Sequence, residues 1–345
     1  MALQAEQAGD RRRLLAACGR GFGLLEEHLG ALGAAELRAH ATAHGAELAG
    51  LAQRAALRSG RPRLLLEWSE RWRAVSLTTP RPSGDPAARA ELAALRDVTA
   101  RLERAETLIP AGFPATVLHR ERLRLEAAVR RRTLWVAGRR RPPAAFDAST
   151  LLTSLASARL LELVVVDGDL HVLVCGDGRI GRLSAGSAAE AAREVAFARF
   201  GLNRIARGRL GPMTEPAEEA LAALALAGCR LEALLLGAAR DQLGDGPLVV
   251  VPPGRLNAVP WGLLPSLAGR AVSVAPSAHA WCRARTARPF GLEKTVLVAG
   301  RGLGAASAEV RTLAAEYGPA TVLAGGSATT ARVLAAGWSL IALGA

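Results

Sequence analysis

LVVVPPGRLNAVPWGLLP, residues 248–265, is the stretch of this sequence that decides its fold. Its first four residues are apolar and three of them are valines, which is typical of a parallel strand covered on both faces. Pro252-Pro253-Gly254 ends the strand, because proline lacks the N–H that a sheet needs. The residues that follow, up to Leu264, predict a loop with a short helix.

From this stretch to the end of the sequence, short apolar runs alternate with helical segments. Strands are predicted at 271–275, 296–299, 321–323 and 340–343, and helices at 276–282, 305–317 and 328–336. This alternation predicts an α/β domain with a mainly parallel sheet. Catalytic residues of such sheets gather at the carboxyl ends of the strands. The sequence stops directly after the last predicted strand, so we expect the domain to be C-terminally incomplete, with an unpaired edge at 340–343.

Before residue 248, three apolar runs predict a strand meander at 160–166, 170–175 and 180–183. Asp167-Gly168 separates the first two runs and is a tight-turn signal. Helices are predicted at about 187–200 and 216–243. The meander and these helices extend the α/β domain toward the N-terminus, so that it covers residues 150–345.

The first 78 residues predict an all-helical region. Leucines recur at helical spacing from Leu14 to Leu37, and the pattern breaks at 58–62. Leu65-Trp68-Trp72-Val75 then lies on one face of a further helix, where core packing explains the tryptophans better than a ligand cage does. One or two degenerate helical-hairpin repeats near the 34-residue, tetratricopeptide-like period fit this region.

Residues 79–149 predict an arginine-rich helical hairpin with linkers. Asp85 is a candidate N-cap with Pro86 at the first helical position, and helices are predicted at 87–108 and 116–136. The predicted domains are therefore 1–78, 79–149 and 150–345.

The net charge is +13, from 44 basic and 31 acidic residues. A basic chain can bind nucleic acid or anionic membranes. However, mixed charges at helical spacing favour a solvated surface, and no aromatic residues interleave with the arginines of 130–141. The sequence therefore argues against a nucleic-acid partner.

No residue is predicted to be catalytic, to bind a cofactor or to bind a metal. Cys18, Cys175, Cys229 and Cys282 are far apart in apolar contexts, which predicts buried, inert thiols in a reducing compartment. His40 and His44 stand four residues apart, but no third metal ligand is evident.

Three other groups resemble sites and have simpler explanations. Cys282 and His279 are three residues apart at a helix start, where a core thiol is expected. Ser277 is a candidate N-cap. Gly300-Arg301-Gly302-Leu303-Gly304 follows a strand but lacks the glycine order and the lysine of phosphate-binding loops, which predicts a plain strand-to-helix turn.

The N-terminus has no secretory pattern, and no uncharged apolar stretch reaches 18 residues. We therefore expect a cytoplasmic protein with no membrane partner.

Several stretches, taken in order, resemble the CHAT domain, a caspase-like domain often attached to tetratricopeptide repeats. Residues 248–265 are similar to its strand, its Pro-Asp-Gly-type turn and its Pro-Phe-x-x-Leu-Pro run, with Pro253 in place of the acidic residue and Trp261 in place of phenylalanine. Further similar stretches are VSVAPSAHAW (272–281), Ala308-Glu309-Val310, VLAGGSATTARVL (322–334) and LLLEWSERWRAVSL (64–77). The resemblance covers about residues 57–345.

The resemblance implies a bacterial cysteine peptidase in which a His-Gly pair follows one strand and a cysteine follows a later one. The family's Leu-His-Leu-x-x-His-Gly aligns with Ile341–Ala345, so the catalytic histidine would follow Ala345, and Ala342 replaces the first histidine. Neither catalytic residue lies in this chain, which is expected to be inactive as given. A protein or peptide substrate is implied only for a longer form, and a protein partner for the helical region. The alternatives are a non-catalytic interaction scaffold and, more weakly, an arginine-driven nucleic-acid binder.

Overall fold

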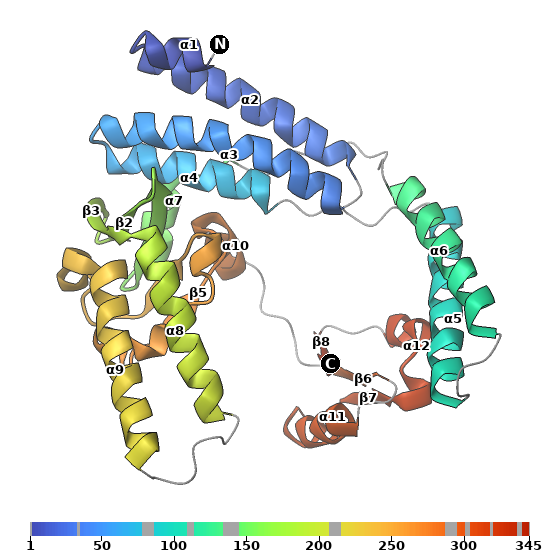
Figure 1. The fold of residues 1–345 in the computed structure, drawn as a ribbon. Coiled ribbons are helices and arrows are strands. Elements are labelled where there is room, and N and C mark those ends of the chain that lie inside the picture. The colour runs from blue at the N-terminus through green and yellow to red at the C-terminus, as the bar shows by residue number, and fades with distance from the viewer. Residues whose placement is uncertain are drawn as a thin grey trace. The chain divides into compact units, whose positions relative to one another are not determined.

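A computed structural model gives the fold in two compact units, Met1–Arg285 and Thr286–Ala345 (Figure 1). The predicted domain boundaries follow changes in sequence pattern and stay a prediction. The structure describes residues 2–32, 35–77, 86–108, 114–133, 145–206, 215–286, 295–300, 304–317, 320–336 and 340–344.

The first unit begins with helices, as predicted. They are α1 (Ala2–Gln7), α2 (Arg11–Ala31), α3 (Ala35–Arg58) and α4 (Pro62–Ser76). Asp10 caps α2 by accepting a hydrogen bond from the backbone N–H of Arg13. Trp68 is buried beside Phe22, with ring centroids 5.9 Å apart, so the packing role predicted for the tryptophans is confirmed.

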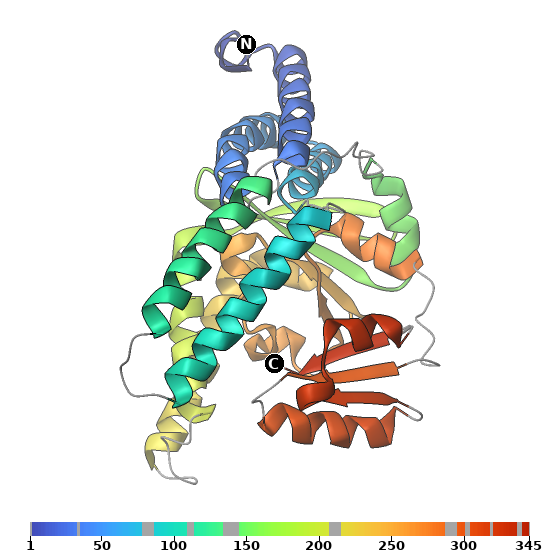
Figure 2. The same cartoon turned by 90° about the vertical axis from the view of Figure 1, so that its right-hand side faces the viewer.

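The predicted hairpin is formed by α5 (Pro86–Leu108) and α6 (Pro114–Thr133), which lie side by side in both views (Figures 1 and 2). Val98, Leu102 and Leu118 form a small core between them. The predicted cap, Asp85, lies outside the described residues.

After α7 (Ala148–Leu155), a five-stranded sheet forms the centre of the first unit. Its strands are β1 (Arg159–Val166), β2 (Asp169–Gly176), β3 (Arg179–Ser187), β4 (Leu248–Val251) and β5 (Val272–Val274), in the order β3-β2-β1-β4-β5. The first three strands are antiparallel, which confirms the meander, whereas β1, β4 and β5 are parallel. Asp167 and Gly168 both have positive φ, as a tight two-residue hairpin turn requires.

Both faces of this sheet are covered, as the apolar run 248–251 predicts. Val249 and Val251 pack into the core that includes residues of α2, α3 and α4. Leu248 and Val250 face the opposite core, which is built with α8 (Ala188–Ala206) and α9 (Glu215–Leu235). The sheet is therefore held between two helical layers.

One predicted helix is shorter than expected. The helix predicted at 216–243 ends at Leu235, because Gly237 has a φ of +48° and the chain continues as the 3-10 turn η1 (Gly237–Gln242). The remaining elements of the first unit are η2 (Gly254–Leu256), η3 (Trp261–Leu263), η4 (Pro265–Leu267) and α10 (Ala278–Thr286).

The second unit is a small parallel α/β sheet. Its elements are β6 (Thr295–Ala299), α11 (Gly304–Glu316), β7 (Thr321–Ala324), η6 (Gly325–Ser327), α12 (Thr330–Ala335) and β8 (Leu340–Gly344), and the strand order is β7-β6-β8. Leu297 of β6 shares a core with Val310 of α11, whereas Val296 packs with Val333 of α12. The two helices therefore cover opposite faces, and β8 lies at an edge of this sheet.

The α/β class and the N-terminal helical region are confirmed. The strands are divided between two sheets, although a single sheet was expected for residues 150–345. In the described part of the chain, none of the helices is long and apolar enough to cross a membrane.

Candidate functional site

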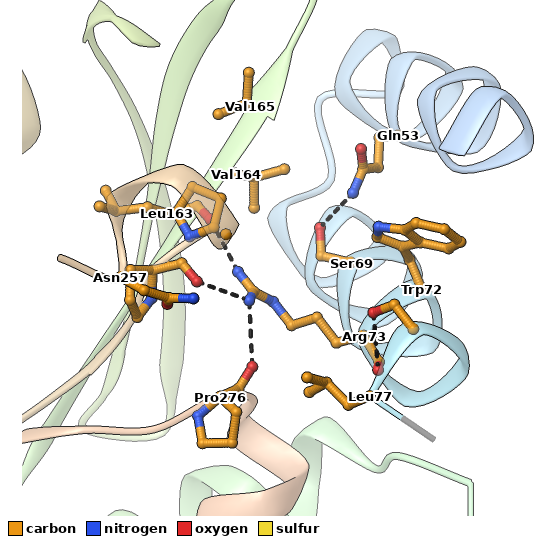
Figure 3. Close-up of a pocket in the computed structure, with 14 residues that line it drawn as sticks. Gln53, Ser69, Trp72, Arg73, Leu77, Leu163, Val164, Val165, Asn257 and Pro276 are labelled. Atoms are coloured by element: carbon orange, nitrogen blue, oxygen red, sulfur yellow. Dashed lines mark hydrogen bonds between the residues drawn. The ribbon is translucent and has the colours of Figure 1, made fainter. Parts of the chain in front are cut away.

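A cavity of about 310 Å³ opens where β4 ends, between α4 and the loop that follows β4 (Figure 3). Arg73 reaches into this place from α4. The lining residues come from three places: helices α3 and α4 (Gln53, Ser69, Trp72, Arg73, Ser76, with Leu77 following), strand β1 (Leu163, Val164, Val165) and the segments after β4 and β5 (Pro252, Pro253, Gly254, Asn257, Pro276).

Arg73 hydrogen-bonds the main chain where the parallel pairing stops. The parallel pairing of β1 with β4 ends at Glu162 opposite Val251. If this pairing continued, the backbone N–H of residue 253 would donate to the carbonyl of Leu163, but residue 253 is a proline. Proline has no N–H. The Nη2 of Arg73 donates to that carbonyl at 3.2 Å instead.

The other terminal nitrogen of Arg73 binds two further carbonyls. Nη1 donates to Pro252 O at 2.9 Å and to Pro276 O at 3.3 Å, so one guanidinium joins α4 to β1 and to the segments after β4 and β5. Figure 3 shows this fork between Leu163 and Pro276.

Arg73 also faces two buried carboxylates. Its Nε lies 3.3 Å from an oxygen of Glu162 and 3.9 Å from one of Glu70. Both glutamate side chains are 0% exposed, and that of Arg73 is 13% exposed. Two acids thus share one cation in the interior, which disfavours the state in which both are ionised.

Burial raises the pKa of Glu162 well above its usual range, and the charge of Glu70 raises it further, although Arg73 opposes both effects. Burial likewise raises the pKa of Glu70, while hydrogen bonds from two backbone N–H groups and the charge of Arg73 lower it. The pair therefore retains a proton at pH values at which exposed glutamates have lost theirs.

Glu70 and Ser277 fix the start of α10. The carboxylate of Glu70 accepts hydrogen bonds from the N–H groups of Ala278 (2.9 Å) and His279 (2.8 Å). The hydroxyl of Ser277 accepts a hydrogen bond from the N–H of Ala280 at 2.9 Å, which confirms Ser277 as an N-cap.

Cys282 and His279 do not form a reactive pair in this structure. Cys282 is half-buried, and burial raises the pKa of its thiol, whereas a nucleophilic cysteine needs a lowered one. Nε2 of His279 is buried and has no hydrogen-bond partner among the described residues. This arrangement agrees with the packing role predicted for Cys282.

The other cysteines divide into two groups. Cys18 and Cys175 are buried, and burial raises the pKa of both thiols. Cys229 is exposed on α9, so the expectation that all four thiols are buried was wrong. The apolar neighbours of Cys229 in sequence belong to the buried face of the helix, from which Cys229 itself points away.

The remaining sequence candidates are the histidine pair His40 and His44 and the glycine-rich stretch 300–304. His40 and His44 lie edge to face, with ring centroids 5.0 Å apart, and no cluster of three metal-ligand side chains occurs in the described ranges. Within Gly300–Gly304, residues 301–303 lie outside the part that the structure describes.

A second cavity of about 460 Å³ lies beside the first turns of α10. Aromatic and charged side chains share its wall: Glu26, Glu67, Trp68, Glu70, Arg71, Phe146 and His279, with Ala74 and Ala145. Arg71 is held there by its stacking over Trp68 and by a hydrogen bond to the carbonyl of Gly19.

Sequence reasoning missed the set Glu70, Arg73 and Glu162. Two signals were present: a single glutamate inside the apolar run 160–166, and an acid three residues before an arginine next to the apolar face of α4. Neither signal identifies the partner, because Arg73 and Glu162 are 89 residues apart in sequence.

No family model matches the chain. No curated protein matches it either. The functional interpretation therefore depends on the residues and geometry described above.

Proposed function

We propose that this chain belongs to a CHAT-type, caspase-like cysteine peptidase. Its N-terminal helices would bind a protein partner. In a longer form of the protein, peptide-bond hydrolysis would take place at the carboxyl ends of β6 and β8. The support comes from the resemblance of residues 57–345 and from the strand order of the second unit.

The observation that carries the proposal is the order β7-β6-β8 with α11 and α12 on opposite faces. The chain leaves β6 toward one side for β7 and then crosses to the other side for β8. The strand order reverses at this point, and open α/β sheets bind ligands in the crevice outside the carboxyl ends of such strands. Ala299 and Gly344 are paired at those ends.

The resemblance assigns the catalytic histidine to the position after Ala345, directly beyond β8 and therefore beside this crevice. The histidine would take the proton of a cysteine from a later segment, the thiolate would attack the scissile carbonyl, and backbone N–H groups would hold the oxyanion. On this proposal, residues 1–345 would supply the scaffold of that site, and both reacting groups would come from a longer form.

Covalent labelling tests this proposal. The protein purified from its source at natural length is treated with peptides that carry a thiol-directed acyloxymethyl ketone, and the adduct is located by mass spectrometry. We expect an adduct on a cysteine beyond residue 345, lost when the histidine after β8 is replaced. An adduct on Cys282 that blocks hydrolysis would contradict the proposal.

The alternative is a non-catalytic interaction scaffold. Large apolar side chains are exposed on α8 and α9, where Phe200 is 62% and Leu226 is 53% exposed. A contiguous apolar patch built from such residues would be the surface that this scaffold offers a partner. A natural protein without the histidine and without hydrolytic activity would favour this alternative.

Nucleic-acid binding has weaker support, because many arginines of the described ranges are paired with acids. Arg54 contacts Asp167 at 2.9 Å, for example, and Arg63 contacts Glu67 at 3.0 Å. Binding to DNA that weakens steeply with salt would support it, and no dependence on salt would exclude it.

A further inference from the structure

His40 and His44 lie on consecutive turns of α3, and both side chains are exposed. Residues four apart are neighbours on the surface of a helix. The two rings meet edge to face, and their centroids are 5.0 Å apart. A small ligand in solution can therefore reach both imidazoles at once.

The distance between the rings matches that of two imidazoles bound to one metal ion. Zinc lies about 2.0–2.1 Å from a ligating histidine nitrogen, so two rings at right or tetrahedral angles around it have centroids roughly 4.5–5.2 Å apart. The separation of 5.0 Å falls within this range. The χ2 torsion of histidine is soft, which lets each ring turn a nitrogen toward a shared point while the helix stays in place.

Packing holds the backbone of this part of α3. Ala41 and Ala49 are buried, and a Cβ added at Gly45 would collide with the side chains of Leu25 and Trp72. The two histidines therefore project from turns that are fixed on their inner side. A pair that keeps its spacing before the ligand arrives loses less conformational freedom on binding.

The charges near the pair also suit a cation, although the whole chain carries a net charge of +13. No arginine or lysine stands between Arg38 and Arg54 in the sequence. Arg38 is buried, and its guanidinium donates hydrogen bonds to carbonyls at the end of α2. Glu47 is exposed one turn after His44, where its negative charge attracts a cation.

We propose that His40 and His44 bind one divalent transition-metal ion of the class that prefers imidazole, namely Ni²⁺, Cu²⁺ or Zn²⁺. One nitrogen of each neutral ring ligates the ion. Water completes the coordination, because no group of three metal-ligand side chains comes together in the described part of the chain. The ion binds the folded helix in preference to the unfolded chain and so stabilises α3. This site lies in the first unit and does not depend on hydrolysis at β6 and β8.

Calorimetric titration of the complete chain with Ni²⁺, at about pH 7.5, tests the site, because exposed imidazoles are mostly neutral there. The protein carries no affinity tag. Cys229→Ala removes the exposed thiol, since thiolates also bind such metals. We expect saturable binding of one ion per chain. Absence of saturable binding would overturn the proposal.

Single substitutions locate the ion. His40→Gln and His44→Gln should each weaken Ni²⁺ binding at least tenfold, because each leaves a single imidazole. His28→Gln, which replaces an exposed histidine in the last turn of α2, should leave binding unchanged. All three positions are exposed, so the variants should fold, and circular dichroism checks this. Unchanged binding by His40→Gln or His44→Gln, or an equal loss in His28→Gln, would overturn the proposal.

A change of spacing tests the geometry at a constant number of histidines. The double variant His44→Gln with Ala46→His keeps two exposed histidines, but residues 40 and 46 lie on different sides of the helix. It should bind Ni²⁺ as weakly as His44→Gln does. An excess of Mg²⁺, which prefers oxygen ligands, should not displace Ni²⁺ from the unchanged pair. Full binding by the double variant, or displacement by Mg²⁺, would contradict a site made by the two imidazoles.

Discussion

Arg73 supplies hydrogen bonds that the local backbone cannot. Pro253 has no N–H to donate to the carbonyl of Leu163. The chain turns into α10 at Ser277 and does not continue the strand β5, so the N–H of Ser277 does not bind the carbonyl of Pro252. The planar guanidinium has five donors in a fixed fork, which lets one side chain bind Leu163, Pro252 and Pro276. The same group balances part of the charge of Glu70 and Glu162.

Arg73→Met should lower the free energy of unfolding by about 3–5 kcal/mol, because it leaves a buried charge without its partner and backbone carbonyls without donors. Arg63→Met, on the exposed side of the same helix, should cost less than about 1 kcal/mol, as expected for a surface ion pair. Urea unfolding of the two variants measures both values. Similar losses of unfolding free energy in the two variants would show that the hydrogen bonds and ion pairs of Arg73 stabilise the fold no more than a surface ion pair does.

Glu162→Gln should stabilise the protein increasingly as the pH rises. The pKa of Glu162 is raised in the folded state by burial and by Glu70, so its contribution to stability is complete below the unfolded pKa, about 4.3, and is lost as pH rises through the folded value. A glutamine at position 162 stays neutral at every pH, so the variant does not lose stability through ionisation of this buried side chain as the pH rises.

Thermal unfolding of Glu162→Gln and of the unchanged protein, measured from about pH 5 to pH 9, checks the sign of this effect. The difference in Tm should grow in favour of the variant toward high pH. A difference that grows toward low pH would mean that Glu162 is an ionised partner of Arg73.

At the scale of elements, two glycines should respond to alanine in opposite directions. A Cβ at Gly228 of α9 would collide with the backbone carbonyl of Leu263, so Gly228→Ala should destabilise the protein by about 1–3 kcal/mol. A Cβ at Gly23 of α2 meets no atom within 4 Å, so Gly23→Ala should stabilise the helix by roughly 0.5–1 kcal/mol. Chemical unfolding distinguishes them, and a tolerated Gly228→Ala would contradict the close packing of α9 on η3.

Local patterns in the sequence predict most of these elements. The apolar run 248–251 and the Asp167-Gly168 turn have the structure that their residues indicate, since strand burial and turn geometry depend on neighbouring residues. The end of α9 was misplaced because Gly237 adopts a left-handed backbone that periodicity does not detect. The Arg73 site was missed because its bonds join residues up to 203 positions apart.

At the scale of the whole molecule, the chain has separate cores. The first unit has apolar clusters on both faces of its sheet, whereas the described residues of the second unit form two small clusters around β6. Small units bury a smaller fraction of their surface and are less stable. We therefore expect two calorimetric transitions, of which the lower belongs to residues 286–345.

Removal of residues 287–345 provides the control for this expectation. The lower transition should disappear, and the upper one should keep its midpoint within a few degrees. A single transition in the complete chain, lost as a whole on truncation, would show that the two units fold together.

Hydrolysis of a peptide library, compared between residues 1–345 and the protein purified at natural length, tests the proposed function most directly. We expect the natural-length protein to cleave peptides and to lose this activity when its thiols are alkylated, while residues 1–345 cleave none. Cleavage by residues 1–345 alone, abolished by a single substitution within them such as Cys282→Ala, would contradict the account.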